Sequence, residues 1–148
     1  MAEVVIVVGS KSDLPALAPA EETLKASGID YEVKVLSAHR QPDETAAFAQ
    51  QAAGRGVRVI IAAAGLSAAL PGFIASHTTL PVLGVPLAVG PLNGLDALLA
   101  ILQMPRGIPV ATLGLGSQGP QNAALLAARI LALAAPGVAT RSGRKVRR

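Results

Sequence analysis

The chain has neither cysteine nor tryptophan, and aromatic residues make up only 2% of its 148 positions. Without cysteine it can form no disulfide and no thiolate metal site. Because rings are scarce, Ala, Val, Leu and Ile must fill the core, and small side chains let helices lie close to a sheet. The two most apolar stretches are interrupted and cannot cross a bilayer. Gly, Ser and Pro interrupt residues 59–75, and Arg129 interrupts residues 122–135. The start, MAEVVIVVGS, has no secretory pattern, so a cytoplasmic location is expected.

Positive charge is unevenly distributed. The formal net charge is +4, but five of the 13 basic residues stand at the end of the chain, namely Arg141, Arg144, Lys145, Arg147 and Arg148. Residues 1–140 therefore carry eight basic and nine acidic side chains, a net charge of −1. We expect residues 1–138 to form one domain and residues 139–148 a basic, disordered tail. An arm for an anionic partner is the alternative for the tail, and no nucleic-acid partner is expected.

Short β-branched runs alternate with helical stretches along the chain. Strands are predicted at 4–8, 31–36, 57–64, 81–87 and 110–115. Helices are predicted at about 14–27, 42–55, around Pro71, 95–103 and 120–135. Five such units with apolar strands are typical of a parallel sheet covered on both faces. The pattern predicts an α/β fold, a flavodoxin-like three-layer αβα sandwich around a five-stranded parallel sheet.

Polar loops follow the first two predicted strands. GSKSD spans residues 9–13, and SAHR spans residues 37–40. Because the carboxyl ends of parallel strands meet at one edge of the sheet, we expect these loops to lie together. Backbone amides and the hydroxyls of Ser10 and Ser12 suit an anion, and Asp13 can accept hydrogen bonds from a sugar. A helix cap made by Ser12 or Asp13 is the alternative interpretation.

The second loop holds two side chains suited to chemistry. The guanidinium of Arg40 presents a planar set of donors that fits phosphate, and the imidazole of His39 is of the type that exchanges protons near neutral pH. Taken alone, His39 could equally be a turn residue. Together with the serine-rich loop, these residues indicate a phosphorylated small molecule that undergoes proton transfer. His77 is expected at a surface or interface, Asp96 in the first turn of a helix and Arg129 at an oligomer interface.

Six motifs occur in one order along the chain: GSKSD, SAHRQPD, AGLSAALPG, LPVLGVP, LNGLDALLAILQMPRGIPVATL and NAALLAARIL. In this combination the chain resembles the catalytic subunit of phosphoribosylaminoimidazole carboxylase over about residues 4–135. The usual bacterial members of that family are N5-carboxyaminoimidazole ribonucleotide mutases of purine biosynthesis. The resemblance implies an isomerase that forms 4-carboxyaminoimidazole ribonucleotide in the domain 1–138. It also implies no metal or organic cofactor, and an octamer with active sites between subunits.

The same resemblance implies roles for single residues. His39 would act as general acid and base, while Ser37 and Arg40 would hold the phosphate. The first loop, with Gly9, Ser10, Ser12 and Asp13, would contact the phosphate and the ribose. Four residues of the turn after the third strand would pack on the aminoimidazole and shape a pocket for carbon dioxide: Ala64, Gly65, Ser67 and Leu70.

That turn departs from the family pattern. Usual mutase members read GGAAHLPG where this chain reads GLSAALPG, so Ala69 replaces a second active-site histidine. A related class that carboxylates aminoimidazole ribonucleotide directly with carbon dioxide also lacks this histidine, but it normally has Lys where Arg40 stands. Mutase chemistry is therefore the first prediction, and direct carboxylation, a lyase reaction, is the alternative. Further alternatives are a weakly active nucleotide-binding paralogue, a carboxylase of another nucleotide heterocycle and a nucleic-acid module driven by the tail.

Overall fold

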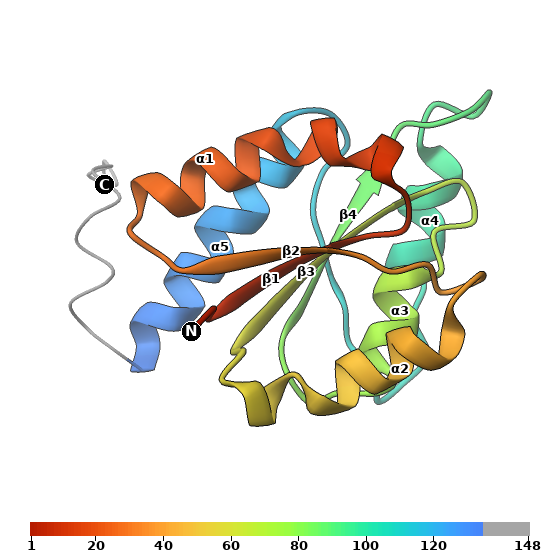
Figure 1. Ribbon diagram of the computed structural model, residues 1–148. Coiled ribbons are helices and arrows are strands. Elements are labelled where there is room, and N and C mark those ends of the chain that lie inside the picture. Colours follow the sequence, from red (N-terminus) through yellow and green to blue (C-terminus); the bar gives the residue numbers. More distant parts are fainter. Residues whose placement is uncertain (135–148) are drawn as a thin grey trace.

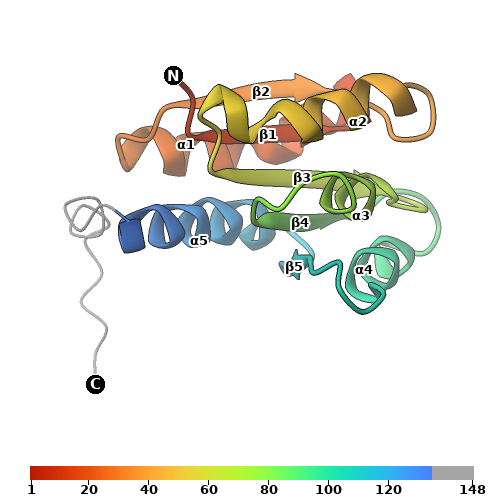
Figure 2. The same cartoon turned by 90° about the horizontal axis from the view of Figure 1, so that it is seen from below.

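Five parallel strands cross the centre of the computed structural model, which describes residues 1–134 (Figure 1). Figure 2 shows them from top to bottom in the order β2-β1-β3-β4-β5. Their bounds are Val4–Val8 for β1, Tyr31–Val35 for β2, Val59–Gly65 for β3, Val82–Leu87 for β4 and Ala111–Thr112 for β5. This is the flavodoxin-like order, so the predicted sheet is confirmed. The predicted domain end at 138 and the tail 139–148 lie outside the described residues.

Helices cover both faces of the sheet. Their bounds are Ala18–Ala26 for α1, Pro42–Gln51 for α2, Leu70–Ala75 for α3, Leu95–Leu102 for α4 and Gln118–Ala134 for α5. The helices α1 and α5 pack together on one face, and α2, α3 and α4 lie on the other (Figure 1). The predicted three-layer sandwich is therefore confirmed. None of the helices within residues 1–134 has the length and hydropathy needed to span a membrane.

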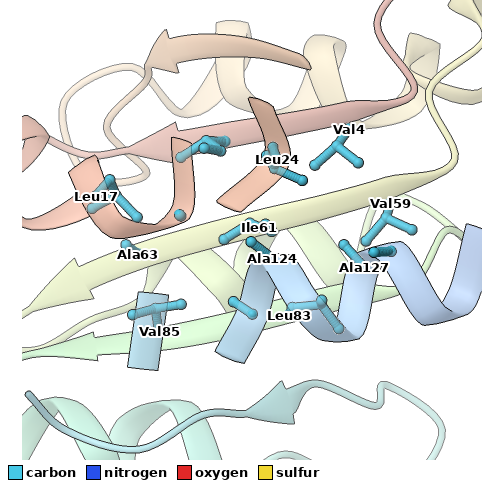
Figure 3. Packing of buried hydrophobic residues seen from close by; sticks show 14 of the residues in the cluster. Val4, Leu17, Leu24, Val59, Ile61, Ala63, Leu83, Val85, Ala124 and Ala127 are labelled. Atoms are coloured by element: carbon cyan, nitrogen blue, oxygen red, sulfur yellow. The ribbon is translucent and has the colours of Figure 1, made fainter. Parts of the chain in front are cut away.

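The core divides into two clusters because the central strands β1, β3 and β4 are apolar on both faces. In β1, Val4, Ile6 and Val8 join the cluster under α1 and α5, whereas Val5 and Val7 join the cluster on the other face. Figure 3 shows the first cluster, in which small alanines of α5 lie against the side chains of β3 and β4. Fully buried alanines let the α5 backbone approach the sheet closely, as expected from the scarcity of aromatic residues.

Two helices begin or end at other residues than the sequence predicted. The helix expected from residue 14 starts instead as a 3-10 helix, Lys11–Leu17, and becomes α-helical only at Ala18. Pro15 lies inside the 3-10 segment, where its missing N–H and fixed ring disfavour a regular α-helix. The helix expected to reach residue 55 ends at Gln51, and a 3-10 turn, Ala53–Arg55, follows it.

The fifth strand is shorter than predicted. Only Ala111–Thr112 pair with β4, whereas six residues, 110–115, were expected in the strand. β5 is an edge strand with one neighbour, and its apolar sequence does not reveal how far that neighbour extends alongside it. Beyond Thr112, one further bond runs from the N–H of Leu113 to the carbonyl of Gly84, and the chain then turns away.

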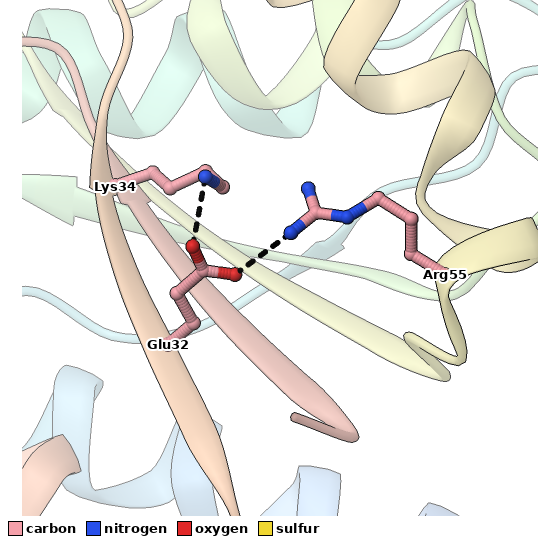
Figure 4. A network of polar contacts seen from close by, with 3 residues as sticks. All are labelled: Glu32, Lys34 and Arg55. Carbon is pink, nitrogen blue, oxygen red and sulfur yellow. Dashed lines mark hydrogen bonds and ion pairs between the residues drawn. The ribbon is translucent and has the colours of Figure 1, made fainter. Parts of the chain in front are cut away.

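The opposite edge strand, β2, carries charges on one face. Lys34 Nζ lies 2.8 Å from Glu32 Oε1, and Arg55 Nη2 lies 3.4 Å from Glu32 Oε2 (Figure 4). The hydrogen bond from Lys34 is the main reason why the pKa of Glu32 lies below its usual value. Exposed ion pairs add little stability, but charges on an edge strand discourage pairing with a foreign strand.

Candidate active site

A cleft of about 250 Å³ lies over the carboxyl ends of β1, β2 and β3. All eleven residues predicted for the site line it: His39, Gly9, Ser10, Ser12, Asp13, Ser37, Arg40, Ala64, Gly65, Ser67 and Leu70. Three loops that are distant in the sequence therefore meet at one place. The cleft is the candidate active site.

The first loop presents paired hydroxyl groups. Ser10 Oγ lies 2.9 Å from Ser12 Oγ and accepts a 3.3 Å hydrogen bond from the backbone N–H of Ser12. The Asp13 N–H donates to the Ser10 carbonyl at 3.1 Å. Ser10 is thus the N-cap of the 3-10 helix, and the alternative of a cap made by Ser12 or Asp13 is wrong. A serine in extended conformation before the first turn leaves its carbonyl and side chain free for this role.

The second loop is a tight turn organised by Ser37. This buried side chain accepts a 3.1 Å hydrogen bond from the Arg40 N–H, and the Ser37 carbonyl accepts one of 2.8 Å from the Gln41 N–H. The turn leaves His39 and Arg40 exposed at the cleft. Arg40 Nη2 also donates to the Gly9 carbonyl at 3.3 Å, which ties the second loop to the first. Since Ser37 Oγ already accepts a bond, its own proton is left to donate to an anion.

The third loop has an unusual backbone conformation. Leu66 and Ala68 have φ values of 55° and 36°, in the left-handed region that costs a non-glycine residue about 1 kcal/mol. The Ala68 N–H closes the turn on the Gly65 carbonyl at 3.0 Å. Between them, Ser67 supplies the hydroxyl of an otherwise apolar segment, 64–70. Backbone strain of this kind persists where surrounding packing holds it, commonly at functional sites.

Comparison with known proteins places this chain in a known family. The family model described as AIR carboxylase matches residues 3–147. The chain belongs to this family. It is 53% identical over 133 residues to the N5-carboxyaminoimidazole ribonucleotide mutase of Saccharolobus solfataricus, covering 90% of this chain and 83% of that one. It is 55% identical over 126 residues to the Pseudomonas aeruginosa protein of that name, covering 85% and 77%.

Solved structures agree with the family assignment. The crystal structure of Treponema denticola PurE superposes with a TM-score of 0.84 at 31% sequence identity. The match covers 93% of this chain and 85% of that one. The sheet and the layers on both sides are therefore those of a solved relative.

One residue of the cleft lining was not predicted at all. Val89, from the loop after β4, joins the lining beside Gly65. A Cβ atom on Gly65 would lie 2.8 Å from Val89 Cγ2, so the glycine is what lets the two loops meet. An apolar residue in a loop gives no signal of this role in the sequence. The remaining lining residues, Ala38, Leu66, Ala68 and Ala69, lie next to predicted ones.

Asp13 is the acidic group of the cleft. Burial raises the pKa of its carboxyl group, while the hydrogen bond with Ser10 and the charge of Arg40 act in the opposite direction and only partly offset burial. The folded chain therefore favours the protonated carboxyl more than the unfolded chain does. Ionised Asp13 lowers the stability of the ligand-free protein, which is typical of a group kept for binding.

We expect Asp13→Asn to stabilise the ligand-free protein slightly at neutral pH, by at most about 0.5 kcal/mol because the group is partly solvated. Since burial raises the pKa of Asp13 in the folded chain, the protonated carboxyl group contributes its full stabilisation below the unfolded pKa of about 3.9. This contribution is lost as the pH rises through the folded pKa. The gain of the variant should thus be absent near pH 3 and constant above the raised pKa. Urea unfolding of both proteins across this range measures it, and a gain that shrinks with rising pH contradicts this assignment.

The other charged residues considered from the sequence lie outside the cleft lining. His77 follows α3, where its Nδ1 lies 2.9 Å from both the Phe73 carbonyl and Ser76 Oγ. Asp96 is in the first turn of α4 as expected, and Arg129 is exposed on α5. Within residues 1–134, no three His, Asp or Glu side chains gather as metal ligands.

Proposed function

We propose that this protein is an N5-carboxyaminoimidazole ribonucleotide mutase of purine biosynthesis. The observation that carries the proposal is the meeting of three loops in one cleft, with an imidazole, a guanidinium and several hydroxyl groups facing the same space. Family members with 50% to 55% identity bear this name. The substrate is a phosphorylated imidazole riboside that carries a carboxylate on its exocyclic nitrogen.

The polar side of the cleft binds the ribose phosphate. Arg40 supplies charge and a planar set of donors, and Ser37 supplies a hydroxyl proton beside it. Ser10 and Ser12 form a second pair of hydroxyls next to the backbone of Gly9. Asp13, which adjoins them, accepts hydrogen bonds from the ribose hydroxyls. This arrangement holds the ring at a fixed distance from His39, which supplies orientation as well as affinity.

The chemistry needs one proton carrier. The bond between the exocyclic nitrogen and its carboxylate breaks, leaving carbon dioxide and aminoimidazole ribonucleotide, and the nitrogen takes a proton. Ring carbon 4 then attacks the carbon dioxide and becomes tetrahedral. Loss of the proton from carbon 4 restores the aromatic ring. His39 gives the first proton and accepts the second, so the imidazole returns to its starting state.

The apolar side of the cleft retains the carbon dioxide. Ala64, Ala68 and Leu70 are all less than a tenth exposed, and they line the cleft together with Gly65. An environment without water favours breakdown of the carbamate and prevents escape or hydration of carbon dioxide. With Ala69 in the turn, the hydroxyl of Ser67 is left to orient the carboxylate on this side.

The proposal extends to assembly and location. Leu95, Leu99 and Leu102 of α4 are each about half exposed and share one helix face, and Leu92 is 59% exposed just before them. An apolar face of this kind supports burial against further copies of the chain. We propose a homo-oligomer, an octamer, that works in the cytoplasm, where purine nucleotides are made.

Two substrates test the proposed reaction. Purified protein is given either the N5 carbamate, without added bicarbonate, or aminoimidazole ribonucleotide with bicarbonate. We expect fast formation of 4-carboxyaminoimidazole ribonucleotide from the carbamate. If the protein converts aminoimidazole ribonucleotide with bicarbonate but not the carbamate, it is a direct carboxylase. Ala69 is the one observation that supports this alternative. Ribonucleotide binding without turnover of either mixture establishes a binding paralogue.

A further inference from the structure

A second pocket, of about 390 Å³, lies beside the cleft. Four prolines are among its lining residues, from the 3-10 helix, α1, the end of β4 and the start of α5, so we name it the proline pocket: Pro15, Pro19, Pro86 and Pro120. Leu87 and Ala88 add apolar surface, and Ser117 adds a hydroxyl. The size and the few polar groups are those of a small-molecule site.

The proline pocket differs from the cleft in charge. No Lys, Arg or His stands among the described residues that line it, and Asp13 is its charged side chain. A phosphorylated ligand would meet a carboxylate and no cation there. The pocket therefore selects against the anionic ligands for which Arg40 and the serines suit the cleft.

The two pockets share a wall. Ser12, Asp13 and Val89 line both of them. On the cleft side this wall is held by the Ser10–Ser12 hydroxyl pair at 2.9 Å and by the Asp13 N–H bond to the Ser10 carbonyl at 3.1 Å. A ligand that binds the Asp13 carboxyl from the proline pocket thus acts on a group that also faces the cleft.

We infer that the proline pocket binds an unphosphorylated planar ring that carries N–H donors, and that this ligand weakens binding of the phosphorylated sugar in the cleft. Rigid proline rings offer flat apolar walls without loss of side-chain entropy, and they suit a flat ring. N–H donors can pair with the Asp13 carboxyl group, which lines this pocket and is only partly solvated. A donor that engages Asp13 competes with the ribose hydroxyls, and this last step rests on the proposed function.

Benzamidine and benzoate are matched probes for the binding step, because they share a ring and differ in the sign of their charge. By equilibrium dialysis, we expect benzamidine to bind in the millimolar range or tighter and benzoate at least about tenfold more weakly. Ser117 is exposed at the pocket, so a phenylalanine there fills it, and Ser117→Phe should weaken the binding of benzamidine at least about tenfold. Gln121 is exposed on α5 and does not line the pocket, so Gln121→Phe should leave the affinity for benzamidine unchanged. Absent binding, equal binding of benzoate or full binding to Ser117→Phe overturns the site.

Ribose 5-phosphate probes the coupling. Saturating benzamidine should weaken its binding about fivefold or more, and ribose 5-phosphate should weaken benzamidine by the same factor. In Asp13→Asn this mutual effect should disappear. Unchanged affinity in the wild type overturns the coupling. If benzamidine binds while ribose 5-phosphate does not bind at all, the proposed function fails and the proline pocket stands.

Discussion

His39→Asn is expected to fold like the wild type and to lose at least about 100-fold in turnover. His39 is exposed in the turn after β2, and its side chain makes no hydrogen bond with any described residue. The turn is held instead by Ser37 and the backbone of Arg40 and Gln41. Asparagine is polar and similar in size, but it cannot carry a proton. The loss should therefore fall on kcat, while nucleotide binding changes by only a few-fold.

The other histidine offers a matched control. His77 lies outside the cleft lining, and Asn can keep a hydrogen bond to the Phe73 carbonyl. His77→Asn should retain the turnover of the wild type in the same assay. Thermal unfolding of both variants separates loss of chemistry from loss of fold. If His39→Asn turns over at the wild-type rate, another group moves the proton.

Gly84→Ala should destabilise the protein by about 2 kcal/mol. Gly84 lies in β4, and a methyl group there would overlap Ile101 of α4 and approach Val110 Cγ1 to 2.9 Å. Ile101 is completely buried, so it has no room to move aside. The variant must push α4 away from the sheet, which leaves a poorly packed layer beneath it.

Gly54→Ala is the control for this substitution. No atom lies within 4 Å of a Cβ built on Gly54, and its φ is not in the left-handed region. A methyl group there should change stability by less than about 1 kcal/mol, and toward stabilisation, because it restricts the unfolded chain. Urea unfolding compares the two midpoints. Equal midpoints would mean that α4 does not pack on β4 as described.

Much of the fold could be predicted from local sequence alone. Runs such as VVIVV at 4–8 are short, β-branched and apolar on both faces, which is typical of a strand covered on both sides. The connections that parallel strands allow then reduce the possible sheet orders to a few, among them the flavodoxin-like one. The cleft could be predicted for the same reason, because loops after neighbouring strands must meet at the carboxyl edge.

Other features depend on contacts between distant residues and could not be predicted. Val89 enters the cleft because Gly65 has no side chain, and the length of β5 depends on how far β4 runs beside it. The left-handed conformation of Leu66 conflicts with its own preference, and only the surrounding packing maintains it. Leu66 and Val89 both line the cleft, so two of these three departures lie at the candidate site, where local preference gives way to function.

The most direct test is a crystal structure with aminoimidazole ribonucleotide bound. The phosphate should lie against Arg40 and the hydroxyls of Ser10, Ser12 and Ser37. Carbon 4 of the ring should then face the His39 imidazole at about 3 to 3.5 Å, within reach for proton transfer. A nucleotide bound elsewhere, or one whose ring points away from His39, would contradict the account.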